Sequence, residues 1–437
     1  MERNLAMARR IARMAEKAGG RVYFVGGFVR DSVMGRESKD VDIEIHGMTA
    51  DAVRGMLGEI GSWKEMGASF GVFALRGYTL DIALPRRGGR KGEDADIDPF
   101  MGVEEAARRR DFTMNAMMRD ALTGTLIDRF GGQADIQNRV IRHVDERTFR
   151  RDPLRAIRAA QFAARLEFAI APETMALCRT LDLGGLARER VMGEMEKALT
   201  RSRRPSRCFE ALREMGQLEP WLKEVAALIG VKQRADCHPE GDAWTHTMLV
   251  VDEAAKLRDE AKNPTGLMLA ALLHDVGKAV AMQEKDGVIH AYGHETAGVP
   301  LAEEFLRRLT GEKALCRYVL NMVELHMKPN MYAAQNSGQK AWNRLFDRSV
   351  CPEDLLLLAK ADHRGRINAA PYAETERTIR ARLSAYEEMM TRPHITGADL
   401  LARGIQPGAE MGRLLEEAHR LRLAGVKKED ALRQMRL

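Results

Sequence analysis

The sequence is poor in the residues that would cross-link a chain through disulfides or anchor it in a membrane. Its 437 residues include only five cysteines, none in a C-x-x-C pair, which argues against a disulfide scaffold and a cysteine-based zinc site. With 14 prolines, 45% hydrophobic and 30% charged residues, a disordered or fibrous chain is excluded. Apolar runs such as 267–273 are far shorter than the roughly 18 residues that span a bilayer, and no signal-like segment precedes the first motif. We expect a cytoplasmic enzyme without membrane contact.

Length and charge bound the remaining possibilities. At roughly 150 residues per domain, 437 residues predict about three domains. The 69 basic and 63 acidic residues give a net charge of +6, which is compatible with nucleic-acid binding without proving it. Strand and helix patterns alternate over the first hundred residues, and helical spacing dominates beyond about residue 138. The sequence therefore predicts a multidomain α+β protein.

Aspartates in the first hundred residues indicate metal-dependent chemistry. Asp40 and Asp42 lie two residues apart in a strand pattern, so the alternation of a strand projects both carboxylates from one face. Asp81, on the second strand of a predicted hairpin, is a candidate third carboxylate. Two Mg²⁺ ions on such carboxylates could activate a hydroxyl and neutralise a triphosphate leaving group. Alone, the D-x-D spacing also fits a solvated strand edge.

A glycine pair precedes these aspartates. Gly26 and Gly27 predict a tight turn between a strand at 21–25 and a helix that carries Arg30 and Asp31. Free backbone amides at the start of such a helix could bind a triphosphate. Because the turn and the carboxylates lie close together in the chain, the combination predicts a nucleotidyl-transfer site.

The chain at this point resembles a known family. The run VGGFVRDSVMGRESKDVDIEI is similar to the signature of class II tRNA nucleotidyltransferases and bacterial poly(A) polymerases, which belong to the DNA polymerase β superfamily. Further similar segments follow in the family's order up to about residue 225. They are a ribose-contacting motif at 109–116, a hinge segment at 128–135, a nucleotide-selecting motif at 151–158 and a neck-helix motif at 189–197.

The ribose-contacting motif carries three of the predicted nucleotide contacts. The resemblance implies that Arg110, Asp111 and Asn115 contact the ribose 2′-hydroxyl and phosphates of the incoming nucleotide. An acidic or amide side chain that accepts a hydrogen bond from that hydroxyl would favour ribonucleotides over deoxyribonucleotides. A solvated helix start is the alternative interpretation of these residues.

The selecting motif contains an acceptor and a planar donor three residues apart. Helical spacing would bring Asp152 and Arg155 to one face, with Arg158 one turn further on. Cytosine and adenine both present an amino donor beside a ring-nitrogen acceptor, whereas uracil and guanine present the opposite polarity. One carboxylate and one guanidinium can therefore admit C and A and refuse U and G without a template. An ordinary surface ion pair is the alternative.

Two departures from the family pattern bear on the substrate. Arg151 stands where the family commonly has a glutamate, and the segment 86–108 is shorter than the family's flexible loop, which helps to switch from C to A addition. The favoured function is CCA addition to the tRNA 3′ end from CTP and ATP, and a CC-adding partial enzyme and a poly(A) polymerase stay open as alternatives. An aminoglycoside-type nucleotidyltransferase would share the D-x-D motif but not explain the helical array.

Histidines and aspartates recur through the second half in an order that resembles the HD superfamily of metal-dependent phosphohydrolases. They are His246, His274, Asp275 and Asp362, with His294 and His326 as further candidates for a second metal site or for phosphate binding. Neighbours in mid-helix diverge by about 100°, so His274 and Asp275 can share an ion only near a helix end, which Gly277 favours. The resemblance implies a divalent metal of unspecified identity and phosphatase, 2′,3′-cyclic phosphodiesterase or 2′-nucleotidase activity. The remaining alternative is an HD phosphohydrolase with a degenerate RNA-binding front half.

The resemblance also implies a domain order. It consists of a polymerase-β-type nucleotidyltransferase head with a small mixed sheet, a helical neck and body for nucleotide selection and RNA binding, an all-α HD domain and a helical tail. The expected boundaries are 1–138, 139–230, 236–386 and 387–437.

Overall fold

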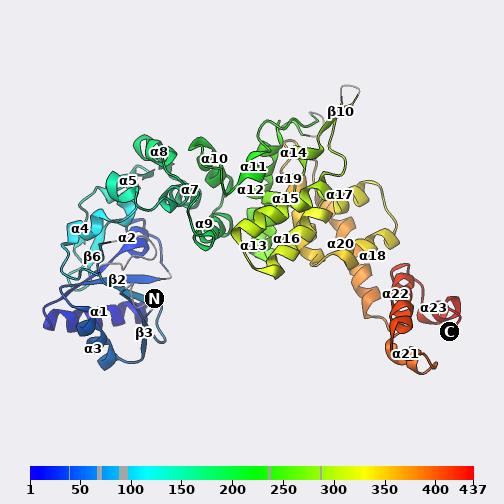
Figure 1. Cartoon of the computed structure of the whole chain (residues 1–437), viewed down its shortest axis with the longest axis horizontal. Coiled ribbons are helices and arrows are strands. Elements are labelled where there is room, and N and C mark those ends of the chain that lie inside the picture. The colour runs from blue at the N-terminus through cyan, green and yellow to red at the C-terminus, as the bar shows by residue number, and fades with distance from the viewer. Residues whose placement is uncertain (39, 66–70, 88–96, 235–237, 286–287) are drawn as a thin grey trace. The chain divides into compact units, whose positions relative to one another are not determined.

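The computed structural model separates into two compact units (Figure 1). The first unit comprises residues 1–186 and 210–217, and the second comprises residues 187–209 and 218–437. The structure describes residues 1–38, 40–65, 71–87, 97–234, 238–285 and 288–437. Among these residues, no helix has the length and apolar character needed to cross a membrane.

The first unit is built on a mixed sheet. Its described strands run in the order β3-β4-β5-β2-β1-β6-β7. They are β1 (Arg21–Phe24), β2 (Val41–His46), β3 (Trp63–Glu65), β4 (Val72–Leu75), β5 (Leu80–Ala83), β6 (Met118–Asp120) and β7 (Leu126–Ile127). Strand β2 pairs parallel with β5 and antiparallel with β1, which confirms the predicted mixed sheet. Val41, Ile43 and Ile45 of β2 are fully buried, so alternation places Asp42 on the opposite face.

Helices and two further short strands complete the first unit. They are α1 (Glu2–Lys17), α2 (Gly26–Val33), α3 (Ala50–Ile60), α4 (Val103–Arg108), the 3-10 helix η1 (Thr113–Asn115), α5 (Gly132–Gln137), β8 (Val140–Ile141), α6 (Glu146–Phe149), α7 (Leu154–Leu166), β9 (Ala169–Ile170), α8 (Pro172–Arg179) and the part of α10 (Ser206–Glu214) from residue 210 onward. Helix α2 begins at Gly26, so the glycine pair forms the first turn of the helix where a separate tight turn was predicted. The positive φ of Gly26, +62°, turns the chain out of β1 directly into α2.

The second unit is mainly helical. Its elements are α9 (Arg188–Arg201), α11 (Lys223–Ala226), α12 (Ala243–Leu257), the 3-10 helix η2 (Arg258–Glu260), α13 (Pro264–Leu273), α14 (Lys278–Ala281), β10 (Gln283–Lys285), β11 (Val288–His290), α15 (His294–Leu309), α16 (Lys313–Leu325), α17 (Met327–Ala334), α18 (Gln339–Arg348), α19 (Pro352–Arg364), α20 (Ala373–Thr391), α21 (Gly397–Leu401), α22 (Ala409–Leu423) and α23 (Lys428–Gln434). Helix α13 is its centre: the run from Gly266 to Leu273 is buried throughout, and α12, α16 and α19 pack against it.

The antiparallel hairpin β10–β11 departs from the predicted all-α organisation of this region. The C-terminal helices pack around a small apolar cluster of their own that includes Ile395, Leu400, Ala418 and Ala431.

Candidate functional site

Three aspartates meet where β2 lies beside β5. In the parallel register Asp42 is opposite Asp81, and Asp40 immediately precedes β2. Burial and the charge of Asp81 raise the pKa of Asp42, with a smaller contribution from Asp40, and these effects outweigh the opposing influence of Arg110. A group of carboxylates that repel one another in this way is stabilised by a divalent cation, and its all-oxygen donor set fits Mg²⁺.

The first turn of α2 lies against one of these carboxylates. A Cβ on Gly26 would lie 3.5 Å from Asp42 Oδ2, and the left-handed φ of Gly26 disfavours any larger residue. The first backbone amides of a helix have no partner within the helix. Amides and carboxylates therefore occur side by side here, an arrangement suited to a triphosphate that carries bound cations.

Hydrogen bonds connect α2 through the predicted ribose motif to α7. Arg30 donates through Nη1 to Asn115 Oδ1 at 2.8 Å, and through Nε and Nη2 to Asp31 at 2.8 and 2.7 Å. Asn115 Nδ2 donates to Asp111 Oδ1 at 3.0 Å, and Arg158 donates to Asp111 Oδ2 at 2.9 and 2.6 Å. Burial raises the pKa of Asp111, but Arg158 and Asn115 hold it below its ordinary value. Five of the predicted nucleotide-binding residues thus form one continuous network.

Arg110 pairs with a carboxylate that was not predicted from the sequence. Its Nη2 lies 2.6 Å from Glu44 Oε2, and Glu44 Oε1 lies 2.9 Å from His46 Nε2. Burial raises the pKa of Glu44, but Arg110 and His46 lower it below its ordinary value. The alternation that identifies Asp42 also places Glu44 on the same face of β2. This alternation could have predicted Glu44 as a residue of the site.

The predicted selecting pair lies at the start of α7. Asp152 precedes the helix, and its Oδ1 accepts a hydrogen bond from Leu154 N at 3.3 Å. Arg155 Nη2 donates to the carbonyl oxygen of Arg109 at 2.7 Å, and its guanidinium lies 5.7 Å from the ring centroid of Phe149. The pair therefore spans the helix start and does not lie within the helix as the spacing argument assumed. Its role in base selection stays a prediction.

Six buried histidines and aspartates converge in the second unit, each at most 5% exposed. They are His246, His274, Asp275, His294, His326 and Asp362. His274 directly follows the last residue of α13, and Asp275 comes next. They thus lie at a helix end, the position that lets adjacent side chains share an ion.

Asp275 lies between two groups of imidazoles. Its Oδ2 is 3.2 Å from His274 Nε2 and 3.8 Å from His246 Nε2. Its Oδ1 is 3.1 Å from His294 Nε2 and 3.7 Å from His326 Nε2. One carboxylate that faces two sets of potential ligands can bridge two metal ions.

The backbone orients three of these imidazoles. The Nδ1 atoms of His274, His294 and His326 each lie 2.8 Å from the carbonyl oxygen three residues earlier. A proton on Nδ1 that is donated to this carbonyl leaves the Nε2 lone pair facing Asp275. The buried His274 Nε2 makes no hydrogen bond to the part of the chain that the structure describes. Neutral imidazoles beside carboxylates fit a divalent metal.

His246 is oriented by a side chain. Its Nδ1 lies 2.8 Å from Glu240 Oε1, and its Nε2 lies 3.1 Å from Asp362 Oδ1. Burial raises the pKa of Glu240, but hydrogen bonds from His246 and His238 outweigh this effect and lower it to about 2. Glu240 was not predicted from the sequence, because it lies outside α12 and has no periodic relation to His246.

Two cations adjoin the centre and were also not predicted. Lys278 Nζ lies 2.6 Å from Asp275 Oδ2 and donates to Gln233 Oε1 at 2.6 Å. Arg366 Nη2 lies 3.5 Å from Asp362 Oδ2. The sequence feature that could have predicted them is their position, since each lies three or four residues after an aspartate of the centre. Cations in such positions suit a phosphate group.

Comparisons with known proteins cover both units. Three family models match: "Poly A polymerase head domain" over residues 22–142, "Probable RNA and SrmB- binding site of polymerase A" over 167–229 and "HD domain" over 243–384. The chain is 33% identical over 427 residues to the multifunctional CCA protein of Actinobacillus pleuropneumoniae serotype 5b, covering 93% of this chain and 98% of that protein. The chain belongs to the multifunctional CCA protein family.

Other matches agree with this family. The multifunctional CCA protein of Ralstonia nicotianae is 37% identical over 383 residues, which cover 82% of this chain and 86% of that protein. The crystal structure of Bacillus stearothermophilus CCA-adding enzyme in complex with CTP superposes with a TM-score of 0.67 at 23% identity, covering 97% of this chain and 94% of that one. This member of the multifunctional CCA protein family therefore shares the fold of that enzyme.

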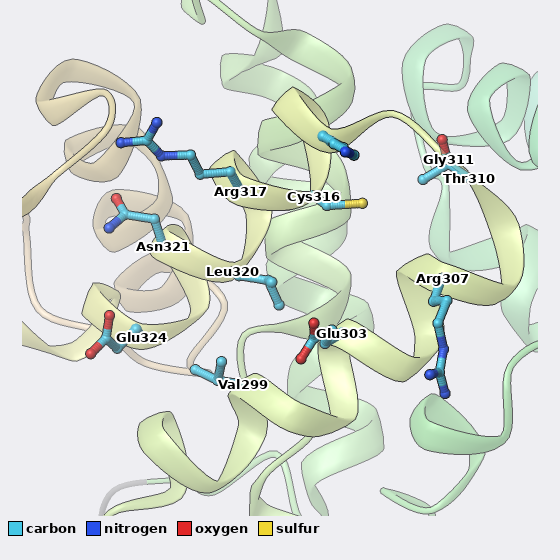
Figure 2. A pocket seen from close by; sticks show the side chains of 11 residues that line it. Val299, Glu303, Arg307, Thr310, Gly311, Cys316, Arg317, Leu320, Asn321 and Glu324 are labelled. Atoms are coloured by element: carbon cyan, nitrogen blue, oxygen red, sulfur yellow. The ribbon is translucent and has the colours of Figure 1, made fainter.

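This multifunctional CCA family member also has a surface groove on α15 and α16 (Figure 2). It encloses about 530 Å³ and is lined by apolar residues such as Val299 and Leu320 and by charges of both signs, among them Glu303 and Arg307. Among the residues that the structure describes, none of the six buried histidines and aspartates lines it. The groove is therefore separate from the candidate metal centre.

The prediction of a shortened loop in this CCA family member concerns the segment 86–108. Residues 88–96 of that segment, like Lys39 in the first motif, lie outside the described residues. The effect of this segment on A addition stays a prediction.

Proposed function

We propose that this chain is a tRNA 3′-end nucleotidyltransferase that adds C, C and A from CTP and ATP without a template in the cytoplasm. The register that sets Asp42 beside Asp81, with Asp40 next to them, carries the proposal. Mg²⁺ held by these three carboxylates would activate the terminal hydroxyl of the tRNA and neutralise the departing pyrophosphate. Membership of the multifunctional CCA protein family supports this assignment.

Backbone and side-chain groups of the protein bind the triphosphate, the ribose and the base of the incoming nucleotide. The first turn of α2 holds the triphosphate, where Gly26 leaves room beside Asp42. The network of Arg30, Asn115 and Asp111 fixes the ribose end of the nucleotide site. Asp152 presents an acceptor to the amino group shared by cytosine and adenine, and the guanidinium of Arg155 presents a donor to the ring nitrogen.

The assay uses purified full-length protein and tRNA that lacks its CCA end, with CTP alone, ATP alone or both nucleotides. CTP alone should extend the tRNA by two residues, and CTP with ATP should extend it by three. Extension that stops at two residues with both nucleotides would identify a CC-adding enzyme. Long A tails would identify a poly(A) polymerase and overturn the proposal.

A second activity is proposed for the six buried histidines and aspartates. Their imidazole Nε2 atoms face Asp275 and Asp362, which favours a metal-dependent phosphohydrolase. A divalent metal held there supplies a Lewis acid for the attack of water on a terminal or cyclic phosphate. We infer that Lys278 and Arg366, which lie beside Asp275 and Asp362, pair with the phosphate oxygens.

Paired variants test whether the two activities are separate. D40A/D42A should abolish nucleotide incorporation and leave hydrolysis of 2′,3′-cyclic nucleotides intact, because the second centre keeps all its groups. D275N should have the opposite effect. Unchanged nucleotide addition by D40A/D42A would reject the first assignment, and unchanged hydrolysis by D275N would reject the second.

A further inference from the structure

Hydrogen bonding to the four imidazoles of the centre follows two patterns. His274 and His326 lie directly after a helix, where the last carbonyl groups have no partner within the helix and can accept from Nδ1. His294 opens α15 and uses the carbonyl of Ala291, which lies before the helix. These three histidines are therefore oriented by neutral backbone groups.

His246 cannot be oriented in this way. It lies within the first turn of α12, and the carbonyl three residues earlier, that of Ala243, already accepts from Thr247 Oγ1 at 2.8 Å in addition to its place in the helix. Its Nδ1 instead meets the carboxylate of Glu240 at 2.8 Å. Among the four imidazoles, His246 is thus the one whose Nδ1 lies within hydrogen-bond distance of a charged side chain in the part of the chain that the structure describes.

Glu240 makes two further contacts. Its Oε1 lies 2.9 Å from His238 Nδ1, and its Oε2 accepts a hydrogen bond from Ile367 N at 3.3 Å. Its side chain is fully buried. Because Ile367 follows the helix that carries Asp362, Glu240 connects the chain before His246 to the chain after Asp362. These are the two residues whose ring nitrogen and carboxylate face each other at 3.1 Å.

We propose that Glu240 is the positioning residue of the histidine–aspartate centre, holding His246 with Nε2 directed at the metal-binding space beside Asp275 and Asp362. This inference rests on the proposed metal-dependent function of the centre. A carboxylate fixes the proton on Nδ1 as a carbonyl does, but its negative charge also makes Nε2 a more basic ligand. His246 is therefore the strongest imidazole donor of the centre, and loss of the charge on Glu240 weakens metal binding.

Glu295 offers a matched control. Its Oε2 lies 3.9 Å from His294 Nδ1, which is beyond hydrogen-bond distance. That Nδ1 is instead hydrogen-bonded to the carbonyl oxygen of Ala291. Glu240 and Glu295 are both carboxylates near a histidine of the centre, and they differ in whether they accept a hydrogen bond from its Nδ1. Replacing each with glutamine separates orientation through the hydrogen bond from a general effect of negative charge.

The experiment measures Co²⁺ binding to full-length protein. All variants carry D40A and D42A, so that the N-terminal carboxylates do not contribute. Calorimetry gives the affinity, and the visible absorption bands of Co²⁺ report its ligands. E240Q should weaken Co²⁺ binding by about 10- to 100-fold and shift the bands, whereas E295Q should match the parent. E240D, whose shorter side chain cannot reach Nδ1 at the same distance, should also bind more weakly than the parent.

The outcomes distinguish this inference from the function on which it rests. If the parent binds no Co²⁺, or binds it as well after H274N substitution, the proposed metal centre is wrong. If the parent binds Co²⁺ and folded E240Q binds it equally with unchanged bands, Glu240 is only structural and the inference fails. Should E240Q not fold, equal affinity of E240D and the parent overturns it.

Discussion

Replacing Gly277 with alanine should damage the histidine–aspartate centre and spare the N-terminal site. A Cβ at this position would lie 2.5 Å from Gly298 N and 2.9 Å from Gly298 Cα, and it would also overlap the carbonyl oxygen of His294. These are backbone atoms of α15, so no side chain can rotate out of the way. To regain an ordinary contact of 3.4 Å with Gly298 N, α15 must move by roughly 0.9 Å at that residue, and the closer overlap with the His294 oxygen requires a larger movement at the start of the helix.

The cost can be estimated from this displacement. Overpacked cores lose about 1–3 kcal/mol, and overlap with rigid backbone puts G277A at the upper end, about 3 kcal/mol. At about 2–4 °C per kcal/mol for a unit of this size, the melting temperature should fall by about 6–12 °C. Metal sites tolerate displacements of about 0.5 Å. A movement of α15 that separates His294 Nε2 from Asp275, now 3.1 Å apart, should therefore lower phosphohydrolase activity by at least about tenfold.

The assay combines thermal unfolding with both activities on purified full-length protein. The control is G193A, within α9 of the same unit, where an added Cβ has no described atom within 4 Å. Alanine in that helix should stabilise by about 0.5–1 kcal/mol. CMP incorporation by G277A should stay near the wild-type level. A G277A protein that melts within about 1 °C of wild type and hydrolyses phosphates normally would refute the reasoning.

Three further predictions concern stability. The lowered pKa of Asp111 means that its stabilisation is fully present above its ordinary value of 3.8 and is lost as pH falls through the folded-state value. D111N breaks its buried ion pair, and urea unfolding between pH 7 and 3 should show a loss of about 3–5 kcal/mol at neutral pH that shrinks in acid. Tyr318 donates to Asp354 Oδ2 at 2.6 Å, so Y318F should cost about 1–2 kcal/mol by denaturant midpoint, and no change would contradict a net contribution from this bond. An added Cβ at Gly132 would overlap the carbonyl oxygen of Thr113, so G132A should lower both the melting temperature and CMP incorporation, and a fully active variant would refute that packing argument.

Much of the N-terminal site could be predicted because its signals are local. The spacing of Asp40 and Asp42 and the glycine pair before them depend on strand alternation and on the conformational freedom of glycine, which act over a few residues. The start of α2 was predicted less accurately, because burial and chain direction decide whether Gly26 ends a turn or begins a helix. The parallel pairing that sets Asp81 beside Asp42 joins strands that are distant in the chain.

The residues that sequence reasoning missed are those with distant partners. Glu44 pairs with Arg110, 66 positions away, and Glu240 contacts the backbone of Ile367, 127 positions away. Neither pair has a shared period or motif from which its contact could be derived. A buried carboxylate requires a donor, but only the packed fold decides which donor is near.

The sequence by itself determined the mixed sheet, the helical remainder, the D-x-D carboxylates and the order of the histidines and aspartates, because short-range periodicity and residue chemistry set these features. The tertiary structure alone decided that Asp275 lies between two groups of imidazoles and that Glu240 reaches His246. Such contacts depend on how helices far apart in sequence pack, and that packing is set by the burial of side chains along the whole chain.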